Sequence, residues 1–160
     1  MRKTIIKDIA ALVLAQVVCF SAAGIGGAFT ATSVRTWYLD IAKPIWTPPS
    51  WVFGPVWTVL YALMGISVWL VWRSGRWSLT RKALLTFGVQ LLLNTVWSII
   101  FFGVRSPGFA FFEILLLWCV IVATIGFFWQ HSKTASVLLV PYLAWSSFAA
   151  FLNFTIWQMN

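Results

Sequence analysis

Five long apolar runs dominate this sequence, and they constrain the fold more than any other feature. Each is close to the ~20 residues that an α-helix needs to cross ~30 Å of hydrocarbon, and none alternates with the period of two expected of a membrane β-strand. The sequence therefore predicts an all-α integral membrane protein, a single domain of residues 1–160 folded as a bundle of five transmembrane helices with its termini on opposite sides. The expected spans are residues 9–29, 51–72, 83–103, 109–130 and 135–157.

The composition excludes the ordinary soluble classes. Hydrophobic residues make up 61% of the chain and charged residues only 9%. A net charge of +8 would suggest nucleic acid in a soluble protein, but here the basic residues lie between apolar runs, where they set topology, so no nucleic-acid partner is expected. Cys19 and Cys119 lie inside apolar runs, where cysteine usually serves as a small packing residue, and they indicate neither a disulfide framework nor a metal site.

The first apolar run follows three basic residues, as in a signal peptide, but it exceeds the roughly 7–15 residues of a signal-peptide core. We therefore interpret it as a retained span. Its second half pairs Ala22 with Gly26 and Ala23 with Gly27 at a spacing that lets helices approach closely. This pattern fits packing within the bundle or a dimer seam.

Basic residues in the short loops indicate the orientation of the bundle, because such residues accumulate on the cytoplasmic side. Three lie on the far side: Arg35, Lys43 and Arg105. Eight lie on the N-terminal side: Arg2, Lys3, Lys7, Arg73, Arg76, Arg81, Lys82 and Lys133. We expect a cytoplasmic N-terminus and, because the N-terminus is not transit-like, a bacterial inner membrane.

The loop of residues 30–50 is rich in aromatic residues and proline. From Thr36 to Trp57 the chain reads TWYLDIAKPIWTPPSWVFGPVW. Proline lacks a backbone donor and moves the preceding residue out of the α region, so the segment from Lys43 to Pro49 should be extended and stiff. Its aromatic rings fit either an interfacial belt or the walls of a pocket for a flat apolar ligand.

Polar residues within the third span share one helix face. Gln90, Asn94 and Ser98 are four residues apart, and Trp97 lies beside them. Such a stripe suits a ligand with polar edges and an apolar body, and it equally suits hydrogen bonds between helices.

The fourth and fifth spans hold the remaining candidates. Glu113 is the one acid well inside a span, where a carboxyl could couple protons to transport, snorkel, or bond to a neighbouring helix. In the fifth span Trp145, Ala149 and Asn153 share a face, and the small Ala149 leaves room beside the indole for a planar molecule. Core and belt packing would give the same spacing.

No catalytic constellation is apparent in the sequence. There is no set of serine, histidine and acid, no pair of carboxylates and no glycine-rich phosphate loop. The single histidine, His131, is expected in a loop without cysteine or acidic neighbours, which is typical of an exposed residue rather than a haem or metal ligand.

Several motifs together resemble the translocator protein family, also called tryptophan-rich sensory proteins or peripheral-type benzodiazepine receptors. The resemblance extends from the first span to Asn153. The motifs are WY at Trp37–Tyr38, KPxWTPP at Lys43–Pro49 followed by Phe53, VWxxLY at Val56–Tyr61, QxxxNxxW at Gln90–Trp97, FFG at Phe101–Gly103, PYLxW at Pro141–Trp145 and LN at Leu152–Asn153.

The resemblance implies a five-helix bundle, commonly a homodimer, whose first loop caps a pocket for porphyrins such as protoporphyrin IX or haem, with no cofactor required. In some bacterial members the tryptophans matching Trp57 and Trp145 are tied to light- and oxygen-dependent breakdown of protoporphyrin, so these two would be the catalytic residues if that chemistry occurs. Carried over by motif, the ligand-binding residues are Trp37, Tyr38, Pro48, Trp57, Asn94, Trp97, Trp145 and Ala149.

Two departures from the family limit what can be carried over. The sterol pattern of animal members needs a tyrosine followed by a basic residue late in the fifth helix, whereas this chain ends FLNFTIWQMN, so a sterol partner is doubtful. The third helix also lacks a clear seam of small residues around Ala83 and Gly88.

These features support three hypotheses about function. The first is a membrane receptor or carrier for tetrapyrroles or other planar apolar molecules, embedded in lipid. The second is oxidative degradation of protoporphyrin by Trp57 and Trp145. The third is a proton-coupled exporter of small aromatic compounds with Glu113 as the coupling group.

Overall fold

The computed structural model describes residues 2–75 and 77–160, with side chains from residue 5 onward. It contains the helices α1 (Arg2–Val34), α2 (Trp37–Asp40), α3 (Ser50–Ser74), α4 (Trp77–Ser98), the π-helical turn η1 (Ile99–Gly103), α5 (Pro107–Trp129), α6 (Lys133–Leu138) and α7 (Val140–Met159). Five helical segments are long and apolar enough to cross a membrane: Ile5–Val34, Ser50–Ser74, Trp77–Gly103, Pro107–Trp129 and Lys133–Met159. The prediction of an all-α bundle of five transmembrane helices is confirmed.

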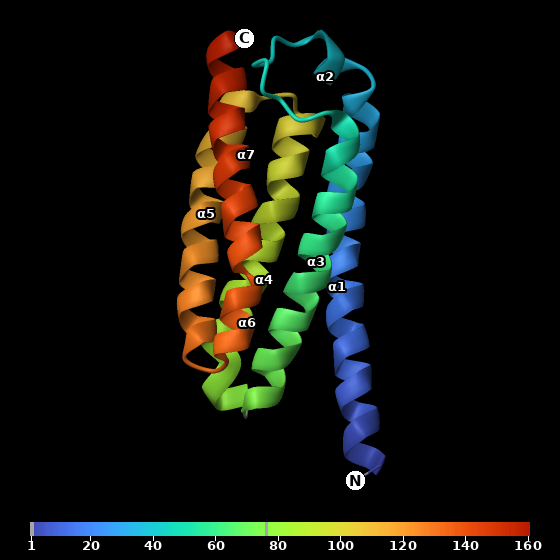
Figure 1. The fold of residues 1–160 in the computed structure, drawn as a ribbon, viewed down its shortest axis with the longest axis vertical. Helices are drawn as coiled ribbons and strands as arrows, with labels where there is room; N and C mark the ends of the chain where they lie inside the picture. The colour runs from blue at the N-terminus through green and yellow to red at the C-terminus, as the bar shows by residue number, and fades with distance from the viewer. Residues whose placement is uncertain (1, 76) are drawn as a thin grey trace.

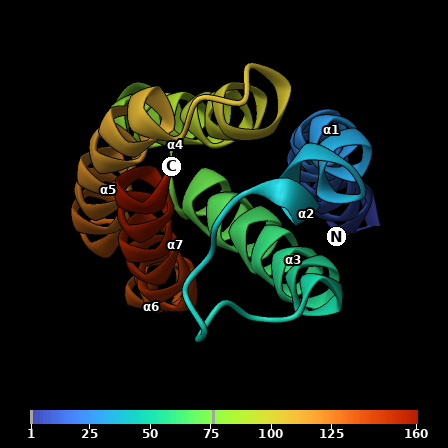
Figure 2. The same cartoon turned by 90° about the horizontal axis from the view of Figure 1, so that it is seen from above.

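The long helices run along a common axis, with the N-terminus and C-terminus at opposite ends (Figure 1). Helix α1 packs against α3 and α4, α5 packs against α4 and α7, and α6 packs against α3 and α5. The short α2 and the loop after it cross the end of the bundle that carries the C-terminus (Figure 2). This loop therefore lies over the helices at the end opposite to the N-terminus.

Large apolar side chains occupy both the interior and the surface of the bundle. The buried core includes Met64, Ile114, Ile121 and Tyr142, while large apolar residues such as Leu14, Leu92 and Leu116 are exposed. In water such a surface would aggregate, but in a bilayer it faces acyl chains, and helices satisfy their backbone hydrogen bonds internally.

The first and third spans are longer than predicted. The first extends to Ile5 and Val34, and the third begins at Trp77, so Arg81 and Lys82 lie on its first turns instead of in a linker. Long basic side chains can keep their stems on a helix and their charges in water, which is why a basic segment at a span end can still be helical. The basic residue at position 76 and the side chains of Arg2 and Lys3 lie outside the described residues.

The fifth span is divided into α6 and α7, a break that was not predicted. Pro141 is its cause, since proline has no N–H and would clash with the carbonyl four residues earlier in a continuous helix. Leu139 instead donates its N–H to Ser136 (3.1 Å), and α7 begins at Val140 with the proline in its first turn.

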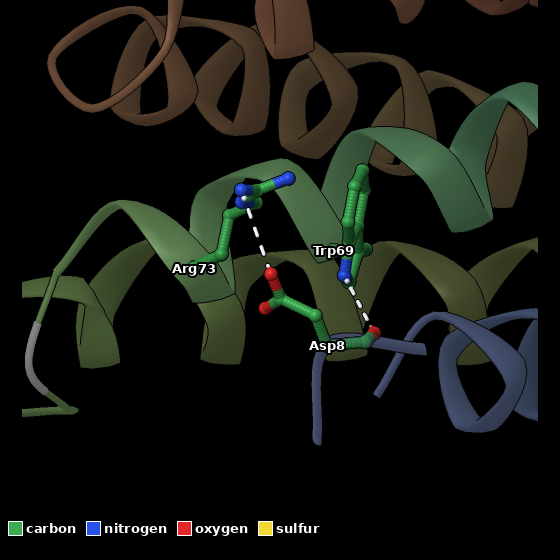
Figure 3. Close-up of polar contacts among 3 residues, drawn as sticks. All are labelled: Asp8, Trp69 and Arg73. Carbon is green, nitrogen blue, oxygen red and sulfur yellow. Dashed lines mark hydrogen bonds and ion pairs between the residues drawn. The ribbon is translucent and has the colours of Figure 1, made fainter. Parts of the chain in front are cut away.

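Contacts between α1 and α3 fix the first helix along the bundle (Figure 3). Arg73 lies 3.5 Å from the Asp8 carboxylate, and the Trp69 indole N–H donates to the Asp8 carbonyl at 3.1 Å. The Arg73 guanidinium also lies over the Trp69 ring, 4.7 Å from its centroid. Closer to the middle, Gln16 donates to the Ala62 carbonyl at 3.0 Å.

The small residues of α1 serve packing within the chain. A Cβ atom placed on Gly26 would lie 3.0 Å from the Ser98 hydroxyl oxygen, so this glycine lets α1 approach the end of α4. Ala22 and Ala23 pack against the buried core. Gly27, in contrast, faces open space.

Candidate functional site

Four aromatic side chains lie between α3 and α7, and we call them the α3–α7 aromatic site. The Phe53 and Trp145 ring centroids are 5.8 Å apart at 71°, and those of Trp57 and Tyr142 are 6.2 Å apart at 63°. Both pairs meet edge to face, an arrangement that aromatic quadrupoles favour. The two predicted tryptophans, Trp57 on α3 and Trp145 on α7, thus belong to two ring pairs that bridge these helices, and both are half-buried.

A buried hydrogen-bond network forms the floor below these rings. The Tyr61 hydroxyl donates to the side-chain carbonyl of Asn94, and the Asn94 amide donates to the Tyr142 hydroxyl at 2.9 Å. The three side chains come from α3, α4 and α7 and are almost completely buried. Asn94 therefore positions Tyr142 of the site and also Tyr61, whose ring centroid lies 5.7 Å from that of Trp57. The spacing of the third span had left this role open.

Trp97 lies in a second aromatic cluster nearer the loop. Its indole N–H donates to the Asn153 side chain at 3.1 Å, and Asn153 in turn donates to the Pro107 carbonyl at 2.7 Å. The Trp97 ring stacks on Phe101 at a centroid distance of 5.2 Å. Hydrogen bonds between helices, one of the two interpretations of the polar stripe, thus account for Asn94 of the stripe and for Trp97 beside it.

The predicted residues of α2 join this second cluster. Trp37 meets Phe101 edge to face at 5.8 Å, and Tyr38 packs against Phe102 at 5.7 Å. Burial raises the pKa of the Tyr38 phenol to about 12. Tyr38 is therefore a neutral residue at physiological pH, which suits an apolar surrounding.

Lys43 holds the loop in shape from within. Its ammonium donates to the carbonyls of Tyr38 (2.5 Å), Leu39 (3.2 Å) and Ile41 (2.9 Å), and it lies 4.9 Å from the centre of the Tyr38 ring. These carbonyls end α2, where a cation is favoured by the helix dipole and by unpaired oxygens. A residue interpreted from sequence as a topology determinant is thus a structural part of the loop.

The loop is also fastened to α7. Trp46 stacks on Phe151 at 5.2 Å and 14°, and Asn160 exchanges two hydrogen bonds of 3.0 Å with the backbone of Ala42. Phe148 links this clamp to the site, since it contacts both Trp46 and Trp145. The segment from Lys43 to Pro49 is extended only in part, because Thr47 donates its N–H to the Pro44 carbonyl at 3.0 Å and closes a turn at residues 45–46. Pro48 lies half-buried in this loop.

Ala149 and Glu113 complete the predicted residues. Ala149 is half-buried and packs at the edge of the core beside Trp145.

Both carboxyl oxygens of Glu113 are buried, and neither has a hydrogen-bond partner among the described residues. The expectation that Glu113 snorkels or bonds to another helix is wrong, because its position on α5 directs it inward, away from both water and a donor.

Sequence reasoning did not identify the hydrogen-bond network of Tyr61 and Tyr142, the role of Lys43 within the loop, or Phe148. It placed Trp46 only among the aromatic rings of the loop. Tyr61 and Tyr142 lie in the VWxxLY and PYLxW motifs, but their shared bond to Asn94 joins segments far apart in the chain.

Comparison with known proteins identifies relatives that match most of the chain. A family model described as the TspO/MBR family matches residues 13–158. The tryptophan-rich protein TspO of Archaeoglobus fulgidus is 46% identical over 149 residues, which is 92% of this chain and 95% of the relative. The translocator protein of Homo sapiens is 41% identical over 139 residues, 85% of this chain and 82% of the relative. The tryptophan-rich sensory protein of Cereibacter sphaeroides is 37% identical over 124 residues, 78% of this chain and 77% of the relative.

Proposed function

The chain belongs to the TspO/MBR family of membrane proteins, and we propose that it is a receptor or carrier that binds tetrapyrroles such as protoporphyrin IX or haem. The observation that carries this proposal is the α3–α7 aromatic site, with Trp57 on α3 and Trp145 on α7. A flat macrocycle entering between them would exchange edge contacts among the side chains for stacking on their faces. The loop fastened by Lys43 and Trp46 would cover it.

Binding in this place agrees with the general character of small-molecule sites. Such sites are concave and mostly apolar, with a few fixed polar groups that set orientation. Here the polar groups are the Tyr61 and Tyr142 hydroxyls, held by Asn94. Other planar apolar ligands would use the same rings.

The test is a titration of the purified protein with protoporphyrin IX in the dark, monitored by tryptophan quenching. We expect saturable quenching whose Kd rises about tenfold in Trp145→Ala, the equivalent of about 1.4 kcal/mol. The matched control is Trp129→Ala, which removes an exposed indole at the end of α5, on the opposite end of the bundle from the loop. Absence of saturable quenching in the wild type would make the tetrapyrrole assignment wrong.

Degradation of protoporphyrin is the second candidate function, and the same two indoles support it. With Trp57 and Trp145 beside the macrocycle, light would excite the porphyrin and molecular oxygen would be the oxidant. The variant Trp57→Phe with Trp145→Phe keeps the apolar walls and removes the oxidisable indoles. If the illuminated porphyrin loses absorbance with wild type but not with this variant, while binding persists in both, the degradation hypothesis is favoured over simple carriage.

Proton-coupled export of small aromatic compounds is the third candidate, and the buried carboxyl of Glu113 supports it. Ionisable groups inside membranes often mark proton pathways. The test is uptake of an aromatic dye into proteoliposomes with an imposed pH gradient. Uptake that is equal in wild type and Glu113→Gln would remove this candidate.

The orientation and assembly are also proposals. The end of the bundle with the N-terminus carries Lys7, Arg73, Arg81, Lys82 and Lys133, which supports a cytoplasmic N-terminus, a loop on the outer side and a bacterial inner membrane. A homodimer is proposed from the family resemblance, and cross-linking of the protein in native membranes would test it. The orientation is tested by Ile45→Cys in the exposed loop, which should react with an impermeant maleimide added outside the cell.

A further inference from the structure

A groove of about 530 Å³ is lined by residues of α2, of the start of α5 and of the end of α7. These segments lie at the loop end of the bundle (Figure 1). Its lining includes Trp37, Arg105, Ser106, Phe109, Phe112 and Trp157, and no residue of α3. The groove is therefore distinct from the α3–α7 aromatic site. Its occupancy does not depend on whether that site binds a tetrapyrrole.

Arg105 provides the charge of this groove. It has the one charged side chain among the described residues that line it, and no carboxylate of the described chain lies within ion-pair distance of its guanidinium. Ser106 beside it makes no cap hydrogen bond with its own side chain. An anionic group would thus find an unpaired guanidinium, whereas a cationic group would find no acidic side chain in the described lining.

The backbone of Arg105 is also unusual. It has φ 58°, the left-handed region, and is the one residue other than glycine with a positive φ in the described chain. The position lies just beyond η1, between Val104, which donates to Ile99 at 2.8 Å, and Ser106, which donates to Ile100 at 3.2 Å. Glycine is favoured where a helix ends in this conformation. An arginine held there points to a use for its side chain.

The groove continues as an apolar strip along α5. Phe109 is 76% exposed, Phe112 62% and Leu116 55%, and their spacing of three and four places them on one helix face. Trp157 backs this strip, with its ring centroid 5.8 Å from that of Phe112. The Trp157 indole approaches α5 so closely that a Cβ atom placed on Gly108 would lie 2.9 Å from the indole nitrogen. The strip leads from the charged end of the groove into the span.

We propose that this groove binds one anionic phospholipid, with the phosphate at Arg105 and an acyl chain along Phe109, Phe112 and Leu116. A single row of apolar side chains one helical turn apart matches the shape of an extended acyl chain better than that of a flat macrocycle. This arrangement argues for an acyl chain. The absence of an acidic residue from the described lining argues for an anionic headgroup over a zwitterionic one, whose ammonium would be unpaired. Bound lipid would also contact Trp37 and so support α2 and the loop after it.

Native mass spectrometry of the protein, purified and re-supplied with phosphatidylglycerol or phosphatidylcholine of identical chains, tests the proposal. We expect wild type to retain phosphatidylglycerol at least fivefold more often than phosphatidylcholine. Arg105→Gln should bring this ratio close to one, whereas Arg105→Lys, with the same backbone conformation and a retained charge, should keep most of it. Arg105→Gly removes the charge and suits the left-handed backbone, so a loss of the ratio in this variant separates the effect of the charge from backbone strain.

Two competitors separate the possible sources of the anion. Glycerol phosphate carries the headgroup without a chain, and protoporphyrin IX carries carboxylates on a flat apolar body. Retention of phosphatidylglycerol in the presence of either at equal concentration supports the lipid. Displacement by glycerol phosphate would assign the groove to soluble phosphates, and displacement by protoporphyrin would assign it to the tetrapyrrole. Each displacement, or a ratio unchanged in Arg105→Gln and Arg105→Gly, would overturn the proposal.

Discussion

The side-chain amide of Asn94 on α4 donates a hydrogen bond of 2.9 Å to the hydroxyl of Tyr142 on α7. Through this bond, and through the one it accepts from Tyr61, Asn94 joins three helices beneath the α3–α7 aromatic site. The Tyr142 ring in turn contacts the Trp57 ring. The Asn94 amide therefore sets the position of Trp57 through Tyr142, without a contact of its own.

Removal of this network should reduce stability in steps. Tyr61→Phe and Tyr142→Phe each delete one hydrogen bond and should cost about 0.6 kcal/mol, the average for such bonds between membrane helices. Asn94→Ala leaves both hydroxyls buried without a partner and should cost roughly 1–3 kcal/mol. Unfolding in a mixed detergent series measures these differences. Equal costs for all three variants would show that the amide does not connect the two tyrosines.

Lys43→Met should loosen the loop without unfolding the bundle. The substitution keeps the apolar stem and removes the ammonium that binds three carbonyls, so backbone amides near residues 37–49 should exchange hydrogen faster. Arg35→Met is the matched control, because it removes an exposed charge at the same end of the bundle. Exchange that is unchanged in Lys43→Met would mean that the clamp of Trp46 and Asn160 suffices to hold the loop.

Glu113→Met should leave the protein as stable as wild type or more stable. A buried carboxyl without a partner destabilises the folded state, and mutational data place the cost of such a polar group at about 1–3 kcal/mol. Methionine fills a similar volume and adapts to irregular gaps. Thermal unfolding monitored by tryptophan fluorescence would measure the change. A loss of stability would indicate that the carboxyl has a partner, such as ordered water, in the folded protein.

The effect of glycine-to-alanine substitutions on stability should differ between glycines on open helix faces and glycines in close contact with a neighbouring helix. Gly27→Ala and Gly88→Ala meet no atom within 4 Å, so the higher helix propensity of alanine should stabilise by up to about 1 kcal/mol. Gly65→Ala would place its Cβ 2.6 Å from the Gln16 side chain, which must then give up its bond to Ala62. It should therefore be the least stable of the three. Destabilisation by the first two alone, in native membranes, would reveal a dimer seam on those faces.

The membrane spans could be predicted from sequence because the length of an apolar run is set by the thickness of the bilayer. The break between α6 and α7 was also encoded, in Pro141, but the apolar run continues through it and hydropathy does not register a missing hydrogen bond. The inward direction of Glu113 depends on the rotation of α5 against its neighbours, which composition does not determine. Likewise, the bonds of Asn160 to Ala42 join positions far apart in the chain.

The candidate site was predicted in outline. The spacing of Trp145 and Ala149 placed them on one face, and the resemblance added Trp57 on another helix. The pairing of Phe53 with Trp145, and of Trp57 with Tyr142, is seen only when α3 and α7 are placed in space.

The affinity of Ala149→Phe for protoporphyrin is the sharpest test of whether the macrocycle binds in the α3–α7 aromatic site. The larger side chain removes no contact, but it fills the space beside Trp145 where the macrocycle is proposed to lie. The control is Ala123→Phe, which adds the same volume on an exposed face of α5. In a dark titration we expect the Kd to rise at least tenfold for Ala149→Phe and to stay unchanged for Ala123→Phe. Equal affinity in wild type and Ala149→Phe would contradict binding at this site.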